Sequence, residues 1–152
     1  MNTPEKIVYN VSSINTGGRE GHADSKDAHS PQLSLDFRVP PEMGGPGGGV
    51  NPEQLFAMGY AACFQGAIGL AAKETGAKVD GSLVRSTVSF GPEGESFGIA
   101  VKLEVYIPDT PLDEAQKLVD RTHELCPYSK ATRGNIPVEV VAVESSDGFY
   151  SA

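Results

Sequence analysis

Residues 51–76 read NPEQLFAMGYAACFQGAIGLAAKETG, and this stretch decides the fold because it predicts one long, almost uncharged helix. Asn51 and Pro52 are typical of a helix start, since asparagine caps the first turn and proline fits its first position. Gly76 is typical of a helix end, because glycine readily adopts the left-handed conformation that closes the last turn. The stretch therefore predicts a helix over residues 52–75.

The composition of this helix indicates whether it lies in a membrane or in a protein core. No charged residue occurs between Glu53 and Lys73, which approaches the length of about 20 residues that spans a membrane. However, Gln54, Gln65 and several glycines interrupt the apolar run, which disfavours a membrane span. A helix that is apolar on every side is otherwise a helix buried on every side, so we expect the central helix of a soluble core.

The rest of the chain predicts strands and one further helix. A short strand is expected at 6–12, a weakly alternating return at 19–23, and clear alternation at 32–39 and 97–107. Residues 83–90 pair with 97–107 through a turn at 91–94, and residues 136–143 form the last strand. Residues 110–113 cap an amphipathic helix that ends at Cys126 and Pro127. This order predicts an α+β fold with antiparallel sheets.

Length and charge narrow the class of protein. The 152 residues are expected to form a single domain, residues 1–152. A formal net charge of -8 disfavours nucleic acid and anionic membrane surfaces as partners. The amino end has no secretory leader pattern, so a cytoplasmic location is expected.

The two cysteines are the first candidates for chemistry. Cys63 lies in the middle of the predicted central helix, and Cys126 directly precedes a proline at a helix boundary. A thiol that reacts with an oxidant needs a second thiol to trap the product. Two cysteines are too few for a secreted disulfide scaffold, which favours reactive thiols in a reducing compartment.

Three segments in order resemble a known family. They are 17–19 (GGR), 51–64 (NPEQLFAMGYAACF) and 126–136 (CPYSKATRGNI). Together they resemble the organic hydroperoxide resistance proteins, within the wider family that also holds the osmotically inducible proteins. The resemblance extends over about residues 8–143 and is weakest over 23–43.

The resemblance implies a thiol peroxidase that reduces alkyl or fatty-acid hydroperoxides to alcohols. It implies an intertwined homodimer without a bound cofactor, in which lipoylated protein or a similar dithiol supplies the electrons. Carried over by position, Cys63 is the attacking thiol, Cys126 the resolving thiol, Arg19 the activating cation and Glu53 the carboxylate that holds it.

These residue types suit that chemistry. A free thiol has a pKa of about 8.5, and burial in an apolar helix raises it further. A guanidinium beside the sulfur has the opposite effect on the pKa, typically by about 1–3 units. Glu53 and Cys63 are ten positions apart, which is about 15 Å along one helix axis. We therefore expect Arg19 and Glu53 to reach Cys63 from the other subunit of the dimer.

Several alternatives remain open from the sequence. His123 and Cys126 share a helical face, which permits a cysteine hydrolase, although a solvated histidine is the plainer interpretation. An osmotically inducible relative with a broader range of peroxides and a non-catalytic oxidant sensor are further alternatives. No metal is expected, because the histidines show no recurring ligand spacing. Tyr128 and Gln65 are candidates for lining the site.

Overall fold

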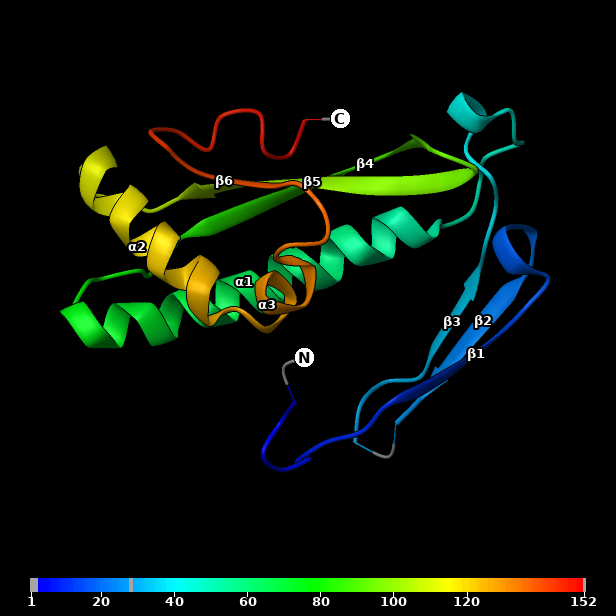
Figure 1. Ribbon diagram of the computed structural model, residues 1–152, viewed down its shortest axis with the longest axis horizontal. Coiled ribbons are helices and arrows are strands. Elements are labelled where there is room, and N and C mark those ends of the chain that lie inside the picture. The colour runs from blue at the N-terminus through cyan, green and yellow to red at the C-terminus, as the bar shows by residue number, and fades with distance from the viewer. Residues whose placement is uncertain (1–2, 28, 152) are drawn as a thin grey trace. The chain divides into compact units, whose positions relative to one another are not determined.

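The computed structural model describes residues 3–27 and 29–151. The chain divides into two compact units, Met1–Pro52 and Glu53–Ala152. Each unit contains one three-stranded sheet, and the helices α1, α2 and α3 accompany the second sheet (Figure 1). The predicted α+β class is confirmed, whereas a single domain over residues 1–152 stays a prediction.

The N-terminal unit is an antiparallel sheet in the order β1-β2-β3. Its strands are β1 (Ser12–Thr16), β2 (His22–Lys26) and β3 (Leu33–Asp36). A 3-10 helix at Gly18–Glu20 joins β1 to β2 and carries Arg19. Gly17 and Gly18 precede Arg19 with φ angles of 74° and 58°, which glycine adopts at little cost. A second 3-10 helix occupies Pro41–Met43.

The strand limits predicted for this unit were wrong. The expected strand at 6–12 begins only at Ser12, whose partner Lys26 is the last residue of β2. The alternating residues Ile7, Tyr9 and Val11 are all more than half exposed, so their apolar pattern reflects no buried face here. The return predicted at 19–23 begins at His22, after the 3-10 turn. The strand predicted at 32–39 is shorter, and Phe37 instead forms an isolated bridge with Val50.

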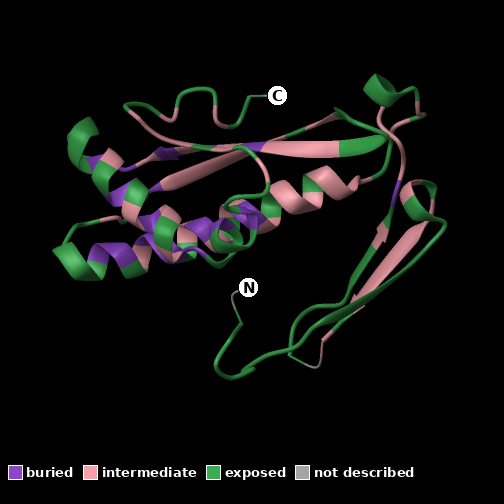
Figure 2. Ribbon diagram, in the orientation of Figure 1, coloured by how far each residue is buried: buried purple, intermediate pink, exposed green. Residues whose placement is uncertain are grey.

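The long helix is confirmed with its predicted bounds. Helix α1 spans Pro52–Thr75, and Gly76 follows with a φ angle of 73°. The Gly76 amide donates to the carbonyl of Ala72 at 2.8 Å and closes the last turn. By length and composition α1 could cross a membrane. However, one side of α1 is buried in the C-terminal unit (Figure 2), and its buried residues are Tyr60, Phe64, Ala67, Ile68, Ala71 and Ala72.

The second sheet has the order β4-β5-β6 and differs from the prediction in one pairing. Strands β4 (Leu83–Glu93) and β5 (Ser96–Tyr106) form the expected antiparallel hairpin. Strand β6 (Val138–Val143) lies parallel to β5, so the sheet is mixed rather than antiparallel. A parallel pair requires a long crossover, which α2 (Leu112–Leu125) and α3 (Pro127–Thr132) provide.

Two turns also differ from their prediction. The hairpin bends at Gly94 and Glu95, because the pairing continues to Glu93 opposite Ser96. Pro92 is tolerated within β4 because β4 is an edge strand. Helix α2 begins at Leu112 without a side-chain cap, and the Thr110 hydroxyl instead donates to the carbonyl of Pro108.

The core of the C-terminal unit fixes α1 against the sheet. The predicted inward face of β5 is confirmed, with Val101, Leu103 and Val105 buried in the same cluster as Phe64 of α1. Figure 1 shows α1, α2 and α3 on one face of this sheet. Cys126 belongs to this cluster and Cys63 packs against it, so both cysteines are positioned by the hydrophobic core of the C-terminal unit.

Candidate active site: a thiol pair between helices

The structure brings the two cysteines together from different elements. Cys63 lies near the middle of α1, and Cys126 is the single residue between α2 and α3. Pro127 cannot extend α2, because a proline inside a helix removes a backbone hydrogen bond and clashes with the preceding turn. Cys126 consequently has an extended backbone, with φ -64° and ψ 124°.

The sulfurs are in contact but not bonded. Cys126 Sγ donates to Cys63 Sγ across 3.6 Å, and both cysteines are free thiols. A disulfide needs a separation of about 2.05 Å, so a movement of about 1.5 Å joins them. The arrangement is that of a reduced pair ready to form a bridge.

The two thiols differ in access. Cys126 is completely buried, whereas Cys63 is only partly buried. Solvent therefore reaches Cys63 but not Cys126. This order agrees with the predicted division between an attacking and a resolving thiol.

The environment of Cys63 in this unit favours the protonated form. Burial raises the pKa of the Cys63 thiol, since a thiolate loses solvation in an apolar site. The nearby backbone of Tyr128 lowers this pKa, while the Cys126 thiol raises it again. A positive group beside the sulfur would oppose this effect and favour the thiolate.

An aromatic cluster joins the first half of α1 to α3. Phe56, Tyr60 and Tyr128 have ring centroids 5.7 to 6.1 Å apart. Gly59 permits this packing, because a Cβ there would lie 3.2 Å from the hydroxyl of Tyr128. Tyr128 lies two residues after Cys126 and remains 40% exposed, so part of this aromatic side chain is open to solvent.

The predicted helpers Glu53 and Arg19 occupy different parts of the chain. Glu53 lies in the first turn of α1, ten positions before Cys63 and thus about 15 Å away along the axis. Arg19 lies in the 3-10 turn of the N-terminal unit. Their roles beside Cys63 remain predictions.

His123 is not the solvated side chain that the sequence suggested. It is partly buried, and its Nδ1 atom lies 2.8 Å from Ser129 Oγ. Cys126 contacts Cys63 instead, so each member of the proposed hydrolase dyad has another partner. Burial and the nearby Arg133 lower the pKa of His123, which favours the neutral ring.

The partners of His123 were not predicted from the sequence. Ser129 is buried and accepts a hydrogen bond from Tyr60 at 2.9 Å. A tyrosine within an otherwise apolar helix was the available signal, since a buried phenol normally has a hydrogen-bond partner. Gln65, by contrast, points to Ser82, to which its amide donates at 2.7 Å, and thus braces α1.

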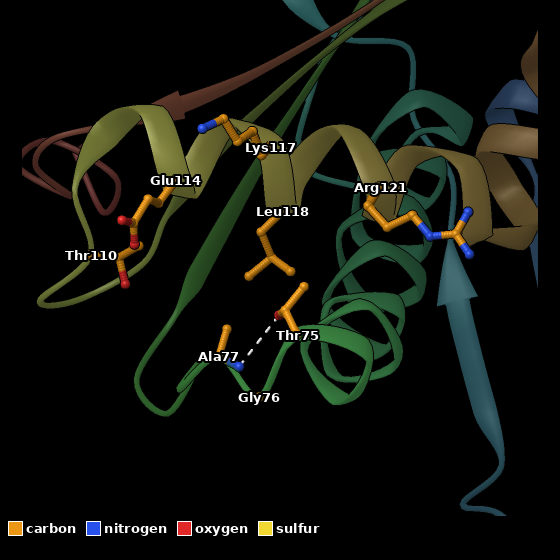
Figure 3. Close-up of a pocket in the computed structure, with 8 residues that line it drawn as sticks. All are labelled: Thr75, Gly76, Ala77, Thr110, Glu114, Lys117, Leu118 and Arg121. Atoms are coloured by element: carbon orange, nitrogen blue, oxygen red, sulfur yellow. Dashed lines mark hydrogen bonds between the residues drawn. The ribbon is translucent and has the colours of Figure 1, made fainter.

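A separate cleft lies at the far end of α1 (Figure 3). It has a volume of about 350 Å³ and lies between the end of α1 and the face of α2. Thr75 on its rim is twelve positions from Cys63, or about 18 Å along the helix. Arg121, which lines this cleft, forms ion pairs with two carboxylates. Its guanidinium nitrogens lie 2.7 Å from Oε2 of Glu74 and 2.6 Å from Oε2 of Glu124. The cleft therefore contains neither thiol.

Comparison with known proteins places this thiol pair in a family. The family model of the OsmC-like proteins matches residues 45–141, which include both cysteines. An organic hydroperoxide resistance protein of Xanthomonas axonopodis pathovar citri is 47% identical over 91% of this chain and 96% of its own length. The chain belongs to the organic hydroperoxide resistance proteins of the OsmC-like family.

Other members of the OsmC-like family agree in sequence and structure. The organic hydroperoxide resistance protein OhrB of Bacillus subtilis is 43% identical over 82% of this chain and 90% of its own length. A crystal structure of an organic hydroperoxide resistance protein from Legionella pneumophila superimposes with a TM-score of 0.83 at 40% identity, covering 92% of this chain and 100% of that one. The OsmC-like fold predicted from the three motifs is thereby confirmed.

Proposed function

We propose that this protein is a two-cysteine peroxidase that reduces organic hydroperoxides to alcohols. The observation that carries the proposal is the contact of 3.6 Å between a partly exposed and a fully buried thiol. The names of the relatives support the substrate class, and the partly exposed ring of Tyr128, two residues after Cys126, suits an alkyl or fatty-acid chain. We also propose that the protein works in the cytoplasm.

In the first step the Cys63 thiolate attacks the outer oxygen of the hydroperoxide. The O–O bond breaks, a sulfenic acid forms on Cys63, and the inner oxygen leaves as an alcohol after it gains a proton. The sulfur supplies both electrons. We assign Arg19 to hold the thiolate and to stabilise charge on the departing oxygen, and Glu53 to orient Arg19.

In the second step Cys126 attacks the sulfur of the sulfenic acid. The S–S bond forms, the S–O bond breaks, and the oxygen leaves as water with the proton of Cys126. A dithiol such as a lipoylated protein then reduces the bridge by two exchanges and becomes a disulfide itself. Formation of the disulfide between Cys63 and Cys126 protects Cys63 from irreversible oxidation.

Mass measurement after one equivalent of tert-butyl hydroperoxide tests the thiol mechanism. The wild-type protein is expected to lose two hydrogen atoms and to yield a linked pair of Cys63 and Cys126 peptides. Because a serine cannot close the bridge, the Cys126→Ser protein is expected to gain one oxygen instead. It releases one alcohol per site and then stops.

The outcomes separate the alternatives. Unchanged mass in both proteins would remove the peroxidase proposal. Hydrolysis of an ester without a dithiol, and dependent on His123, would favour the hydrolase instead. If hydroperoxide oxidises Cys63 and Cys126 in the wild-type protein but a dithiol does not reduce them again, the non-catalytic oxidant sensor would be favoured.

We further propose that the active unit is a homodimer with a composite site. The outer side of α1 presents apolar residues at every fourth position, with Met58 63% and Leu70 54% exposed. Gly66 between them would have open space around an added Cβ. An uncharged helix face of this kind favours a second copy of the chain, because apolar surface is stabilised by burial.

Sedimentation tests the homodimer. The wild-type protein is expected to sediment at twice its chain mass of 16.0 kDa. A Leu70→Glu substitution buries a charge in the proposed interface and should shift the protein to monomer, with loss of peroxide turnover at the same concentrations. Leu112→Glu is the matched control, since Leu112 is 42% exposed in the first turn of α2, where an acidic residue is favourable. A monomeric wild-type protein with full turnover would contradict the composite site.

A further inference from the structure

A buried network of hydroxyl groups joins the three helices around the thiol pair. Tyr60 of α1 donates to Ser129 Oγ of α3 at 2.9 Å and lies 3.1 Å from Thr132 Oγ1. Ser129 Oγ also lies 2.8 Å from Nδ1 of His123 in α2. Tyr60 and Ser129 are completely buried, so no water replaces a partner that is lost.

The donors and acceptors form a directed chain. Tyr60 donates its only proton to Ser129, and we assign the remaining hydrogen bond so that Ser129 donates to Nδ1 of His123. This requires a neutral imidazole, which agrees with the lowered pKa of His123. Removal of the Ser129 hydroxyl would leave Tyr60 and His123 without this shared partner, which weakens the link between the helices.

Residues of this hydroxyl network lie close in sequence to both cysteines. Tyr60 lies one turn before Cys63 on α1, and Ser129 lies three residues after Cys126. Between them, the backbone of Tyr128 lies close enough to the Cys63 sulfur to lower the pKa of that thiol. The carbonyl of Tyr128 accepts from Thr132 Oγ1 at 2.9 Å. The segment that carries Cys126 is therefore held to α1 through these hydroxyls.

We propose that Tyr60, Ser129 and His123 are positioning residues that hold Cys126 against Cys63 and thereby speed disulfide closure. The proposal rests on the two-cysteine function stated above. In closure the Cys126 sulfur forms the S–S bond, the S–O bond of the sulfenic acid breaks, and water leaves. The sulfurs start 3.6 Å apart. A misplacement of about 1 Å in such a step costs up to about 10²-fold in rate.

Single-turnover kinetics of Ser129→Ala test the proposal. After one equivalent of tert-butyl hydroperoxide, closure is followed by rapid quenching, alkylation of free thiols and mass measurement. Closure is expected to slow about tenfold, while release of the first alcohol changes by less than about twofold. Tyr60→Phe removes only the phenol oxygen and should give the same pattern if Ser129→Ala folds poorly.

The controls distinguish positioning from general loosening. Ser82→Ala removes another buried serine hydroxyl that binds a side chain of α1, the amide of Gln65. It should leave closure unchanged. His123→Asn keeps a polar partner for Ser129 and should restore most of the rate that His123→Leu loses. Equal slowing of both steps by Ser129→Ala, or an unchanged closure rate, would overturn the proposal.

A second measurement is independent of peroxide. Each protein is equilibrated with mixtures of reduced and oxidised dithiothreitol, and the fraction of bridged Cys63 and Cys126 is determined. The equilibrium constant for bridging is expected to fall about tenfold in Ser129→Ala relative to wild type, because the thiols are less well held together. A wild-type protein that bridges here but releases no alcohol from a hydroperoxide would contradict the proposed function alone.

Discussion

The Cys63→Ser protein is expected to lose turnover of tert-butyl hydroperoxide with dihydrolipoamide by about 10³-fold or more. The physical reason is that a serine hydroxyl is not ionised near neutral pH and is a far weaker nucleophile than a thiolate. Serine also cannot form a sulfenic acid, so the second step has no substrate. Alcohol release measured with excess dithiol gives the rate directly.

The loss must be separated from loss of the fold. Cys63 packs at the edge of the core and serine is of similar size, so the thermal midpoint should change by only a few degrees. The Cys126→Ser protein is the matched control, since it keeps the first turnover and loses only the recycling. Turnover in Cys63→Ser within tenfold of wild type would exclude Cys63 as the nucleophile.

The Arg19→Ala protein is expected to show the second largest loss of peroxide reduction. This loss should depend on pH, because it arises from a change in the pKa of Cys63. Burial raises the pKa of Cys63, and the proposed guanidinium counteracts that effect by about 1–3 units. Without the arginine, the midpoint for thiolate formation should therefore move upward by this amount. At neutral pH the rate of peroxide reduction should fall about 10- to 10³-fold, and raising the pH should recover part of it.

The measurement is the rate of iodoacetamide alkylation against pH in a Cys126→Ser background, where only Cys63 reacts. Arg19→Lys keeps the charge but not the planar fork, so it should lie between wild type and Arg19→Ala. Arg85→Ala serves as control, because Arg85 is paired with Glu104 at 2.6 Å in the second sheet. An alkylation midpoint that does not move in Arg19→Ala would remove Arg19 from the mechanism.

The sequence was most informative where local chemistry alone determines the structure. Asn51 and Pro52 start α1 and Gly76 ends it, because caps and turns depend on neighbouring residues. The alternating face of β5 was equally clear, since it packs on the core. The expected strand at 6–12 failed for the opposite reason. Its apolar residues are exposed, and only the pairing with β2 sets where β1 begins.

Contacts between distant segments could not be predicted from local patterns. The parallel pairing of β6 with β5 depends on how α2 and α3 cross the sheet, which no single segment specifies. The cysteine pair was predicted because only two cysteines exist and the family motifs are specific. The link of Tyr60 to Ser129 spans 69 positions, so the tyrosine signals a buried partner but its own segment does not say which residue that partner is.

The complete burial of Cys126 gives the regeneration step a direction. If the partly exposed sulfur remains the outer one after oxidation, an incoming reductant can strike only at Cys63, and Cys126 must depart as the leaving group. The transient adduct with the electron donor would then always sit on α1, and the inner thiol would never carry a foreign adduct. One-sided access thus makes the inner cysteine resistant to stray modification by small thiols such as glutathione.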